Sequence, residues 1–423
     1  MKVHVSHGNS RVELPDAVAE NAMVLRPNIP RNNSSAGAVT GRFQRAMLSP
    51  VAGPRLKDAA RGGKRACVVV SDKTRRYGVD IWLSALIDEL NAAGIPDEAV
   101  TVLFATGAHE QHDFAERAAI VGPEVAVRVR MVDHDCDAED DLVPLGTTKA
   151  GTPVRINRII VESDVVVTTG AVMPHYYAGF SGGRKSIVPG VAARDTIFAN
   201  HSLNLAMCGG TEKRARTVVL EGNPVHEDLL EAASFVDVTF SVQAVCDASG
   251  NPAAFFTGGQ SQAHSAACSL AAQWYCVSLD RPLPWVVASC GGFPKDINLY
   301  QSHKSLDNAF RAVGRGGTIF LIAKCRDGLG PEGFASWFNY PDTAAVEEKL
   351  REKFEVMGHT ALRTMEKVRA ARVFLMSDLP ETIVMRMGMI PVWDLADIPR
   401  AINVRAARGA VMPHASLTVP LMS

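Results

Sequence analysis

The sequence predicts an α/β protein with two α/β domains, mostly parallel sheets, and an active site in the cleft between them. Three observations support this prediction. Short β-branched runs alternate with segments of helical periodicity, which is typical of βαβ units. The chain has 423 residues, more than a single hydrophobic core usually contains. Several predicted strands end in small, polar turns, and open parallel sheets bind their ligands beyond such strand ends.

The first predicted domain covers residues 1–275. Its opening residues alternate apolar and polar side chains, which favours a strand or hairpin. Helices are expected over residues 81–93 and in the polar stretch that ends at Arg117. Strands are predicted over residues 66–71, 100–104, 125–132 and 159–169. Strands separated by helices of this length predict a parallel sheet with helices on both faces.

The second predicted domain covers residues 276–404, after a turn-like break between residues 250 and 285. Helices are predicted in the polar stretch that ends at Val313 and over the charged run 347–371. Strands are predicted over residues 285–289, 318–323 and 372–376. The tail, residues 405–423, could return to the first domain or join the second.

Composition argues against several classes of protein. Lysine and arginine total 44 and acidic residues total 45, so the net charge of −1 favours neither nucleic acid nor an anionic membrane as partner. None of the eight cysteines forms a C-x-x-C pair, which favours reduced, mostly buried thiols. No stretch approaches the ~20 apolar residues of a membrane span, and the opening residues do not resemble a signal peptide. We therefore expect a cytoplasmic protein.

Three predicted strands end in turns with reactive side chains. Residues 71–75 read Ser-Asp-Lys-Thr-Arg, residues 106–109 read Thr-Gly-Ala-His, and Gly170 opens a segment that reaches His175. Because the carboxyl ends of parallel strands meet at one edge of a sheet, we expect these segments to converge on a single site.

Residues 179–186, Gly-Phe-Ser-Gly-Gly-Arg-Lys-Ser, resemble a phosphate-binding loop. Against the pattern G-x-x-x-x-G-K-[ST], Lys185 and Ser186 are in register, but Arg184 replaces the second glycine and should obstruct the wrap around a triphosphate. The glycines would still let backbone N–H groups approach an anion. The alternative interpretation is a basic surface turn.

Two residues near this loop are candidates for chemistry. Lys185 stands beside a second cation and before an apolar turn, conditions that can lower the pKa of a lysine and make it a nucleophile. His201, sixteen residues later (201 − 185), is a candidate metal ligand on a predicted helix. The alternative for His201 is an ordinary core or surface histidine.

At this point the residues match a known pattern. Residues 174–192, PHYYAGFSGGRKSIVPGVA, resemble the cofactor-attachment signature of the nickel-dependent lactate racemase family, whose members carry a nickel-pincer nucleotide. Shorter matches follow in the family's order over nearly the whole chain, at residues 71–75, 105–109, 199–201, 221–228, 300–304 and 413–420.

The resemblance implies a role for each matching residue. Lys185 would be linked to the pyridinium ring of the cofactor through a thioamide. His201 would complete square-planar Ni(II) beside the cofactor's sulfur, carbon and sulfur donors. His109 and His175 would be the acid–base pair. Substrate-binding residues would be Arg75, Tyr300, Gln301 and Lys304, and the nucleotide would be seated by Asp72, Gly179, Ser181, Gly182, Gly183 and Arg184.

The implied activity is that of an isomerase, a racemase or epimerase acting at C2 of a 2-hydroxy acid. One histidine takes the hydroxyl proton while a hydride leaves C2 for the cofactor, and a planar 2-keto acid forms. Return of the hydride to the other face inverts the centre. The resemblance also implies partners, namely the proteins that make the cofactor and insert nickel.

The pocket wall departs from the family's lactate enzymes, and the cofactor machinery does not. Lys73, Arg76 and Glu110 stand where those enzymes have histidine, proline and arginine, and Trp337 is a loose counterpart of their substrate-covering tryptophan. A longer or more polar acid, such as an aromatic hydroxy acid, malate or a sugar acid, is therefore expected to suit the pocket as well as lactate does.

Two other functions stay open from the sequence. A phosphate-loop phosphotransferase would need the glycine that Arg184 replaces, and no clear acidic strand end for Mg²⁺ is evident. A cofactor carrier or sensor without turnover would need neither His109 nor His175, so their presence argues against it.

Overall fold

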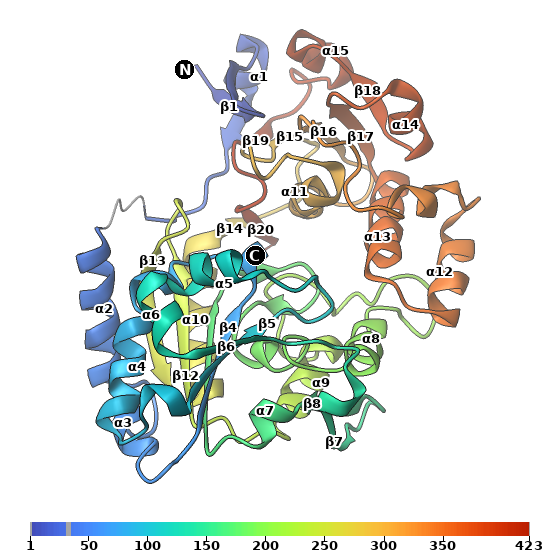
Figure 1. The fold of residues 1–423 in the computed structure, drawn as a ribbon. Coiled ribbons are helices and arrows are strands. Elements are labelled where there is room, and N and C mark those ends of the chain that lie inside the picture. The colour runs from blue at the N-terminus through green and yellow to red at the C-terminus, as the bar shows by residue number, and fades with distance from the viewer. Residues whose placement is uncertain (1, 31–34, 423) are drawn as a thin grey trace. The chain divides into compact units, whose positions relative to one another are not determined.

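The structure is a computed structural model that describes residues 2–30 and 35–422 (Figure 1). Its contacts divide the chain into two compact units. We call Ile29–Leu203 with Arg214–Trp274 the central unit, and Met1–Asn28, Asn204–Lys213 and Tyr275–Ser423 the terminal unit. Both units are built on six-stranded, mostly parallel sheets, which confirms the predicted α/β class.

The central unit has the strand order β13-β12-β9-β4-β5-β6 (Figure 1). All neighbouring strands pair in parallel except β12 and β13, which form an antiparallel edge. The strands are β4 (Ala66–Ser71), β5 (Val100–Ala105), β6 (Arg130–Asp133), β9 (Val165–Ala171), β12 (Phe240–Cys246) and β13 (Pro252–Gly258).

Helices cover both faces of this sheet because its strands are apolar on both sides. Along β4, Val68 and Val70 pack with α2 (Ala36–Leu48) and α4 (Leu83–Ala92). The alternate residues Cys67 and Val69 pack in a separate cluster with α8 (Arg194–Ser202) and α9 (Pro224–Ala233). Continuous burial of this kind is what parallel sheets require. The remaining elements are α3 (Leu56–Ala59), α5 (Phe114–Val121), α6 (Pro123–Arg128), α7 (Arg158–Val161), α10 (Gln260–Tyr275) and the antiparallel pair β7 (Leu142–Thr147) and β8 (Pro153–Asn157).

Three predicted elements of the central unit need correction. The strand predicted over 125–132 is mostly the helix α6, which starts at Pro123 and leaves a strand only at Arg130–Asp133. Residues 159–161 of the strand predicted over 159–169 belong instead to α7 (Arg158–Val161), which is capped by the side chain of Asn157. The polar helix expected to end at Arg117 begins only at Phe114 and runs to Val121, because Asp113 and Glu116 form a capping box there.

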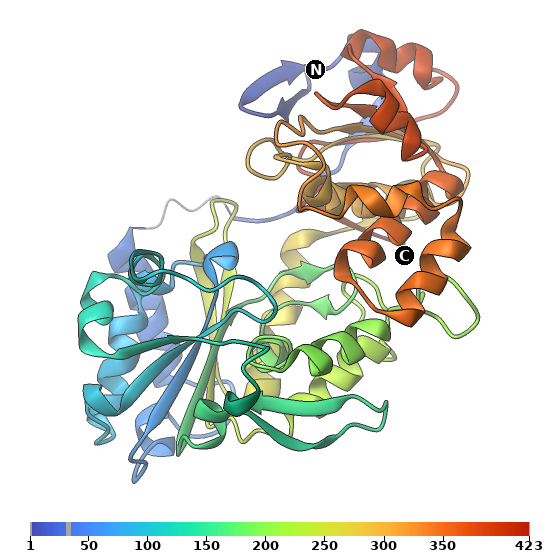
Figure 2. The same ribbon diagram turned by 45° about the vertical axis from the view of Figure 1, so that its right-hand side comes forward.

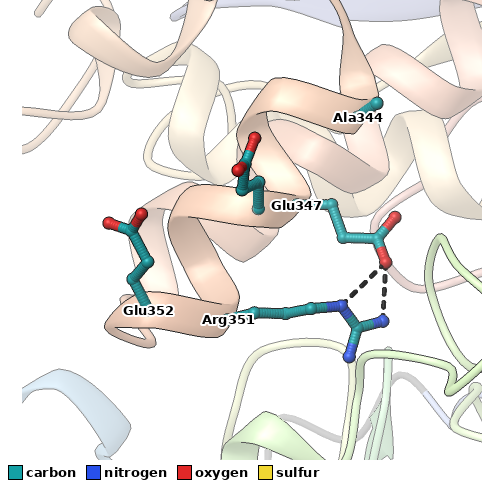
Figure 3. Close-up of a pocket in the computed structure, with 5 residues that line it drawn as sticks. Ala344, Glu347, Arg351 and Glu352 are labelled. Carbon is teal, nitrogen blue, oxygen red and sulfur yellow. Dashed lines mark hydrogen bonds and ion pairs between the residues drawn. The ribbon is translucent and has the colours of Figure 1, made fainter.

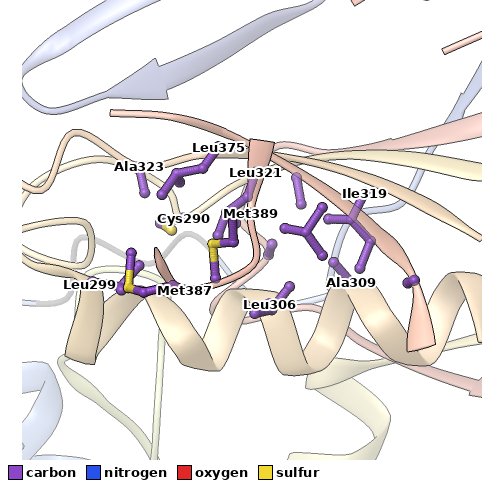
Figure 4. Close-up of a cluster of buried hydrophobic side chains, with 14 of the residues drawn as sticks. Cys290, Leu299, Leu306, Ala309, Ile319, Leu321, Ala323, Leu375, Met387 and Met389 are labelled. Carbon is purple, nitrogen blue, oxygen red and sulfur yellow. The ribbon is translucent and has the colours of Figure 1, made fainter. Parts of the chain in front are cut away.

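The terminal unit has the strand order β18-β17-β16-β15-β19-β3, with every pair parallel. Figure 2 shows this unit with its N-terminal hairpin in blue and its C-terminal helices in orange and red. The strands are β3 (Ala22–Val24), β15 (Trp285–Ser289), β16 (Thr318–Ile322), β17 (Arg372–Met376), β18 (Ile390–Val392) and β19 (Gly409–Met412). On one face, Leu306 and Ala309 of α11 (Leu299–Val313) lie against Ile319 and Leu321 of β16 (Figure 4).

The N-terminal segment packs on the other face of the terminal sheet. The expected hairpin is present as β1 (His4–His7) and β2 (Ser10–Glu13), and it is followed by α1 (Asp16–Asn21). Val5 joins Trp285 and Phe320 in a buried cluster. We expected residues 1–275 to form one domain, but β3 pairs with β19 and the N–H of Leu25 donates to the carbonyl of Val411. Residues 1–28 therefore belong to the terminal unit, as does the tail, whose β20 (Val419–Met422) pairs with β14 (Cys276–Leu279).

A loop from the middle of the chain, residues 204–213, also belongs to the terminal unit. The N–H of Gly210 donates to Glu347 (2.6 Å), and the N–H and hydroxyl of Thr211 donate to Glu366 (2.9 and 2.6 Å). Glu347 is also paired with Arg351 on the same helix (Figure 3). Carboxylates thus hold this loop through two of its backbone N–H groups and the hydroxyl of Thr211.

The charged run 347–371 is two helices and not the single one predicted. α12 (Thr343–Glu352) begins where the side chain of Asp342 accepts from the N–H of Ala345, and α13 (Val356–Ala370) follows a three-residue break. The remaining elements of this unit are α14 (Glu381–Arg386) and α15 (Ile398–Ala401).

The eight cysteines form no disulfide, and six of them are buried, as composition led us to expect. Among the residues that the structure describes, no helix is both long enough and apolar enough to cross a membrane.

Candidate active site

The central sheet reverses its strand order between β4 and β9. From β4 the chain continues outward through β5 and β6, and from β9 it continues outward in the opposite direction through β12. At such a reversal the crossover connections diverge and leave a crevice beyond the carboxyl ends of the two strands. The turn that begins at Asp72 follows β4, and the segment that contains His175 and Lys185 follows β9. The predicted site residues of the central unit are thus placed where an open sheet binds its ligands.

Asp72 organises the turn after β4. Its carboxylate accepts from the N–H and hydroxyl of Thr74 (2.8 and 2.6 Å) and lies 2.6 Å from Nδ1 of His109. Burial raises the pKa of Asp72, but the hydrogen bond from His109 and the charge of Arg75 outweigh it and lower the pKa to about 2. An ionised carboxylate at Nδ1 keeps the ring hydrogen on that atom, so the lone pair of a neutral His109 is on Nε2.

The lowered pKa of Asp72 makes a pH-dependent contribution to stability. Because the folded pKa lies below the ordinary value of 3.8, the contribution is complete above about pH 4 and is lost as the pH falls toward 2. We expect the difference in free energy of unfolding between the wild type and Asp72→Asn to shrink by about 2 kcal/mol over this window. Urea unfolding at several pH values measures it, and a difference that stays constant from pH 6 to pH 2 would contradict the assignment.

The segment after β9 is a tight double turn held to the sheet by hydroxyl groups. It contains the short pair β10 (Pro174–His175) and β11 (Gly179–Phe180), followed by a 3₁₀ turn at Gly183–Ser186. The hydroxyl of Ser181 donates to the carbonyl of Ala171 (2.8 Å), and that of Ser186 donates to the carbonyl of Thr169 (2.9 Å). These bonds fix both ends of the turn that carries Lys185.

Gly179 is needed in this turn for two reasons. Its φ of +75° is unfavourable for other residues, and a Cβ there would lie 2.4 Å from the carbonyl oxygen of Val219. We expect Gly179→Ala to lower the free energy of unfolding by about 2–4 kcal/mol, the sum of backbone strain and overpacking. Gly151→Ala is the matched control, because Gly151 has a φ of +89° but no atom within 4 Å of a Cβ, and should cost about 1–2 kcal/mol. Equal losses in urea unfolding would refute the steric part.

Lys185 is buried, with 6% of its surface exposed. Burial lowers its pKa well below the ordinary value, and the positive charges of Arg75 and Arg184 lower it further. Its Nζ lies 5.2 Å from the centre of the Tyr177 ring. The lowered pKa favours the uncharged, nucleophilic form of the amine.

His201 is buried on α8, where its Nδ1 lies 2.7 Å from the carbonyl oxygen of Ile197. Because a carbonyl can only accept, Nδ1 carries the hydrogen and Nε2 carries the lone pair, the form in which histidine binds metals. Burial and the nearby Lys185 lower the pKa of His201 to about 3, so the ring is neutral. His201 is buried, as it would be if it were an ordinary core histidine. Its tautomer is also the one that a metal ligand needs.

Tyr177 joins these residues and was missed from the sequence. Its ring lies 5.3 Å from that of His201 and 4.5 Å from that of His175, and it also faces Lys185. His175 accepts at Nδ1 from the N–H of Ala178 (3.3 Å), so its neutral ring carries the hydrogen on Nε2. Lys185, His201 and His175 therefore all lie around the ring of Tyr177. The position of Tyr177 two residues after His175, in the run His-Tyr-Tyr, was the only available signal.

The predicted substrate-binding residues of the terminal unit lie at the start of α11. The helix is capped by Asn298, whose side chain accepts from the N–H of Gln301 (2.9 Å), and Lys304 donates to Oε1 of Gln301 (2.9 Å). Tyr300 is partly buried and stacks edge-on against Phe334. Gln301 and Lys304 thus present an amide and an ammonium group side by side on one helix turn.

A second buried histidine supports the turn after β4 and was not expected. Nε2 of His112 accepts from the N–H of Lys73 (3.1 Å), and its Nδ1 lies 2.8 Å from the carboxylate of Asp133. Lys73 itself is paired with Glu116 (2.6 Å). A carboxylate–histidine pair thus fixes the backbone between Asp72 and Arg75, and no local sequence pattern reveals it because Asp133 comes from another strand.

Comparisons with known proteins found two family models and two relatives that match this chain. Residues 6–212 match the family model described as the lactate racemase N-terminal domain, and residues 281–408 match the lactate racemase C-terminal domain. The lactate racemase of Thermoanaerobacterium thermosaccharolyticum is 34% identical over 340 residues, covering 79% of this chain and 77% of the relative. The lactate racemase of Lactiplantibacillus plantarum is 29% identical over 332 residues, covering 78% and 76%.

Solved structures show the same likeness. The lactate racemase apoprotein from Thermoanaerobacterium thermosaccharolyticum matches with a TM-score of 0.88 and 30% identity over the whole of both chains. A protein from Thermotoga maritima matches with a TM-score of 0.67 and 17% identity over 95% of this chain and all of that one, which shows a shared fold alone. The chain therefore belongs to the lactate racemase family, and it is an enzyme with racemase activity, an isomerase.

Proposed function

We propose that this enzyme inverts C2 of a 2-hydroxy acid with a nickel-pincer nucleotide held covalently on Lys185. The observation that supports this proposal most directly is the chemical state of two buried side chains. Burial holds the pKa of Lys185 well below its usual value, which favours the uncharged amine, and His201 is a neutral imidazole whose lone pair is on Nε2. A covalent tether and a metal ligand need these two states, and both residues contact the ring of Tyr177.

The residues present fit the proposed cofactor. Lys185 would hold it through a thioamide and His201 would bind the Ni(II). Asp72, Gly179, Ser181, Gly182 and Gly183 would seat the nucleotide near the turn. When bound, the cofactor supplies a hydride acceptor that can also return the hydride.

The chain's own residues would manage the proton of the substrate hydroxyl. Nε2 of His109 has the lone pair to accept that proton, because Asp72 keeps the ring hydrogen on Nδ1. His175 has the opposite tautomer and presents an N–H at Nε2, because its Nδ1 accepts from Ala178. Inversion needs one group that takes a proton and another that can donate a hydrogen bond to the same oxygen, and the two histidines supply these complementary states.

The substrate carboxylate would be bound by Arg75, which can grip it bidentately, together with Tyr300, Gln301 and Lys304. Lys73 and Arg76 are two of the residues that differ from the family's lactate enzymes. Lys73 forms an ion pair with Glu116, and Arg76 is exposed to solvent. We propose that the substrate class extends to 2-hydroxy acids longer or more polar than lactate.

The test is a panel of single-enantiomer 2-hydroxy acids that includes lactate, malate and an aromatic hydroxy acid. Protein coexpressed with the cofactor-making and nickel-inserting proteins would be checked by intact mass, and the loss of optical activity followed. We expect one or more acids to racemise only with loaded protein. Loaded protein that racemises none of them would overturn the proposed substrate class, and protein that never gains mass would overturn the proposed cofactor.

A further inference from the structure

The loop of residues 204–213 interrupts the central unit directly after α8. The chain leaves the central unit after Leu203 and returns to it at Arg214. The loop doubles back on itself, since the N–H of Ala206 donates to the carbonyl of Gly210 (2.9 Å). Groups that hold this loop therefore also restrain the two segments of chain that enter and leave it.

Charged side chains of α12 and α13 hold the loop in the terminal unit. Glu347 and Glu366 accept from two of its backbone N–H groups, and Arg351 donates to the carbonyl of Ala206. Glu366 lies so close that a Cβ on Gly210 would be 3.0 Å from its carboxylate. Hydrogen bonds to ionised groups are roughly twice as strong as those between neutral groups, so these side chains contribute much of the hold on the loop.

His201 stands between this loop and an anchor in the central unit. Asn200 is buried, and its side-chain amide donates to the carbonyl of Val225 (3.1 Å) and to the carboxylate of Asp228 (2.9 Å). Asn200 is thus fixed in the central unit, whereas Asn204 already belongs to the terminal unit. The proposed metal ligand lies in the short stretch between these two fixed points, in the last turn of α8.

The segment after the loop returns to the turn that carries Lys185. Ala215 is buried in the central unit, in the same cluster as residues of α8 and α9. The N–H of Val218 then donates to the carbonyl of Gly179 (2.9 Å). The loop is therefore inserted between the proposed metal ligand and the segment that supports the cofactor turn.

We propose that Glu347 and Glu366 are positioning residues for His201. By holding the loop they fix the chain on the carboxyl side of the metal ligand, so that its ring stays in the orientation that binds nickel. A ligand held in place loses less conformational freedom when the metal binds. The inference rests on the proposed role of His201, and the two carboxylates act through hydrogen bonds to the loop.

The experiment compares two proteins that lose carboxylates from the surface of the same helices. The double variant Glu347→Ala, Glu366→Ala removes the hold on the loop. Glu348→Ala is the matched control, because Glu348 is exposed on α12 beside Glu347. Alanine is a good helix former, so α12 and α13 should stay folded. Leu205 still packs against the core of the terminal unit, so the loop should be loosened and not detached.

Hydrogen exchange of the full-length apoproteins, followed by mass spectrometry, measures the restraint. In the double variant we expect the amides of the loop to exchange about tenfold faster or more, and those of residues 199–203 about threefold faster. The amides of α9 should keep the wild-type rate, and Glu348→Ala should match the wild type throughout. Faster exchange confined to the loop would overturn the proposal, and so would unchanged exchange in the loop.

Nickel retention tests the link to the metal. The loaded double variant should lose its nickel to a chelator about threefold faster or more than the wild type and Glu348→Ala. Equal half-lives would overturn the positioning role. A protein that never takes up nickel would instead refute the proposed cofactor, and the exchange result on the restraint of His201 would still stand. If the double variant does not fold, Glu366→Ala alone replaces it, and the same outcomes decide.

Discussion

Replacing Lys185 with methionine is expected to abolish racemisation and to remove the cofactor mass from the intact protein. Methionine keeps the length of the side chain in its buried place and has no amine, so the covalent link cannot form. We expect activity to fall by about 10³-fold or more, because the chemistry depends on a group that the chain would no longer hold. Intact mass after coexpression with the cofactor-making proteins, and polarimetry on the same sample, measure the two effects.

Lys149→Met is the matched control for this variant. Lys149 is exposed and lies on the loop between β7 and β8, away from the turn after β9. Its loss should leave both the added mass and the rate unchanged. A Lys185→Met protein that still gains the cofactor mass would show that the tether is elsewhere.

The second large effect is expected at His109. Its replacement by alanine removes the proposed base and should lower the rate by about 10²–10⁴-fold, while the nickel content stays that of the wild type. Asp72→Asn should also lower the rate, because an amide can no longer hold the ring hydrogen on Nδ1 by its charge. The loss should be smaller than for His109→Ala, because the imidazole itself is still present.

The double variant tests whether the two residues act as a unit. Because Asp72 is proposed to act on turnover through His109, the rate per bound nickel of the variant that combines Asp72→Asn with His109→Ala should be no lower than that of His109→Ala alone. Losses per bound nickel that multiply instead would show that Asp72 affects turnover by a second route, apart from its proposed role in seating the nucleotide. Nickel analysis of all three proteins separates lost chemistry from lost loading.

Local patterns predicted much of the sheets. The runs at residues 66–71, 285–289 and 372–376 are strands with the expected bounds, because β-branched residues flanked by turn signals specify a buried strand without outside help. The apolar residues between 125 and 128 are compatible with a helix as well as with a strand. Pro123, in the first turn of α6, favours the start of a helix there.

Pairing between distant segments could not be predicted in this way. Residues 22–24 have no local feature that indicates their partner at residues 409–411. The candidate site shows the same division. The residues in the turns after β4, β5 and β9 were found from their motifs, whereas Tyr177 and His112 act through partners that only the folded chain provides. Placement of the residues in α11 relative to those turns stays a prediction.

The three-part origin of the terminal unit has a consequence for synthesis. The central unit is complete once residue 274 has been made, whereas β19 ends at Met412, 138 residues later (412 − 274). At translation rates of roughly 5–20 residues per second, about 7–28 s separate the two events. During that time β3 has no β19 to pair with, and Val5 and Leu14 lack most of the surface that covers them in the finished fold. Residues 2–28 are thus made before the central unit but reach their final packing after it.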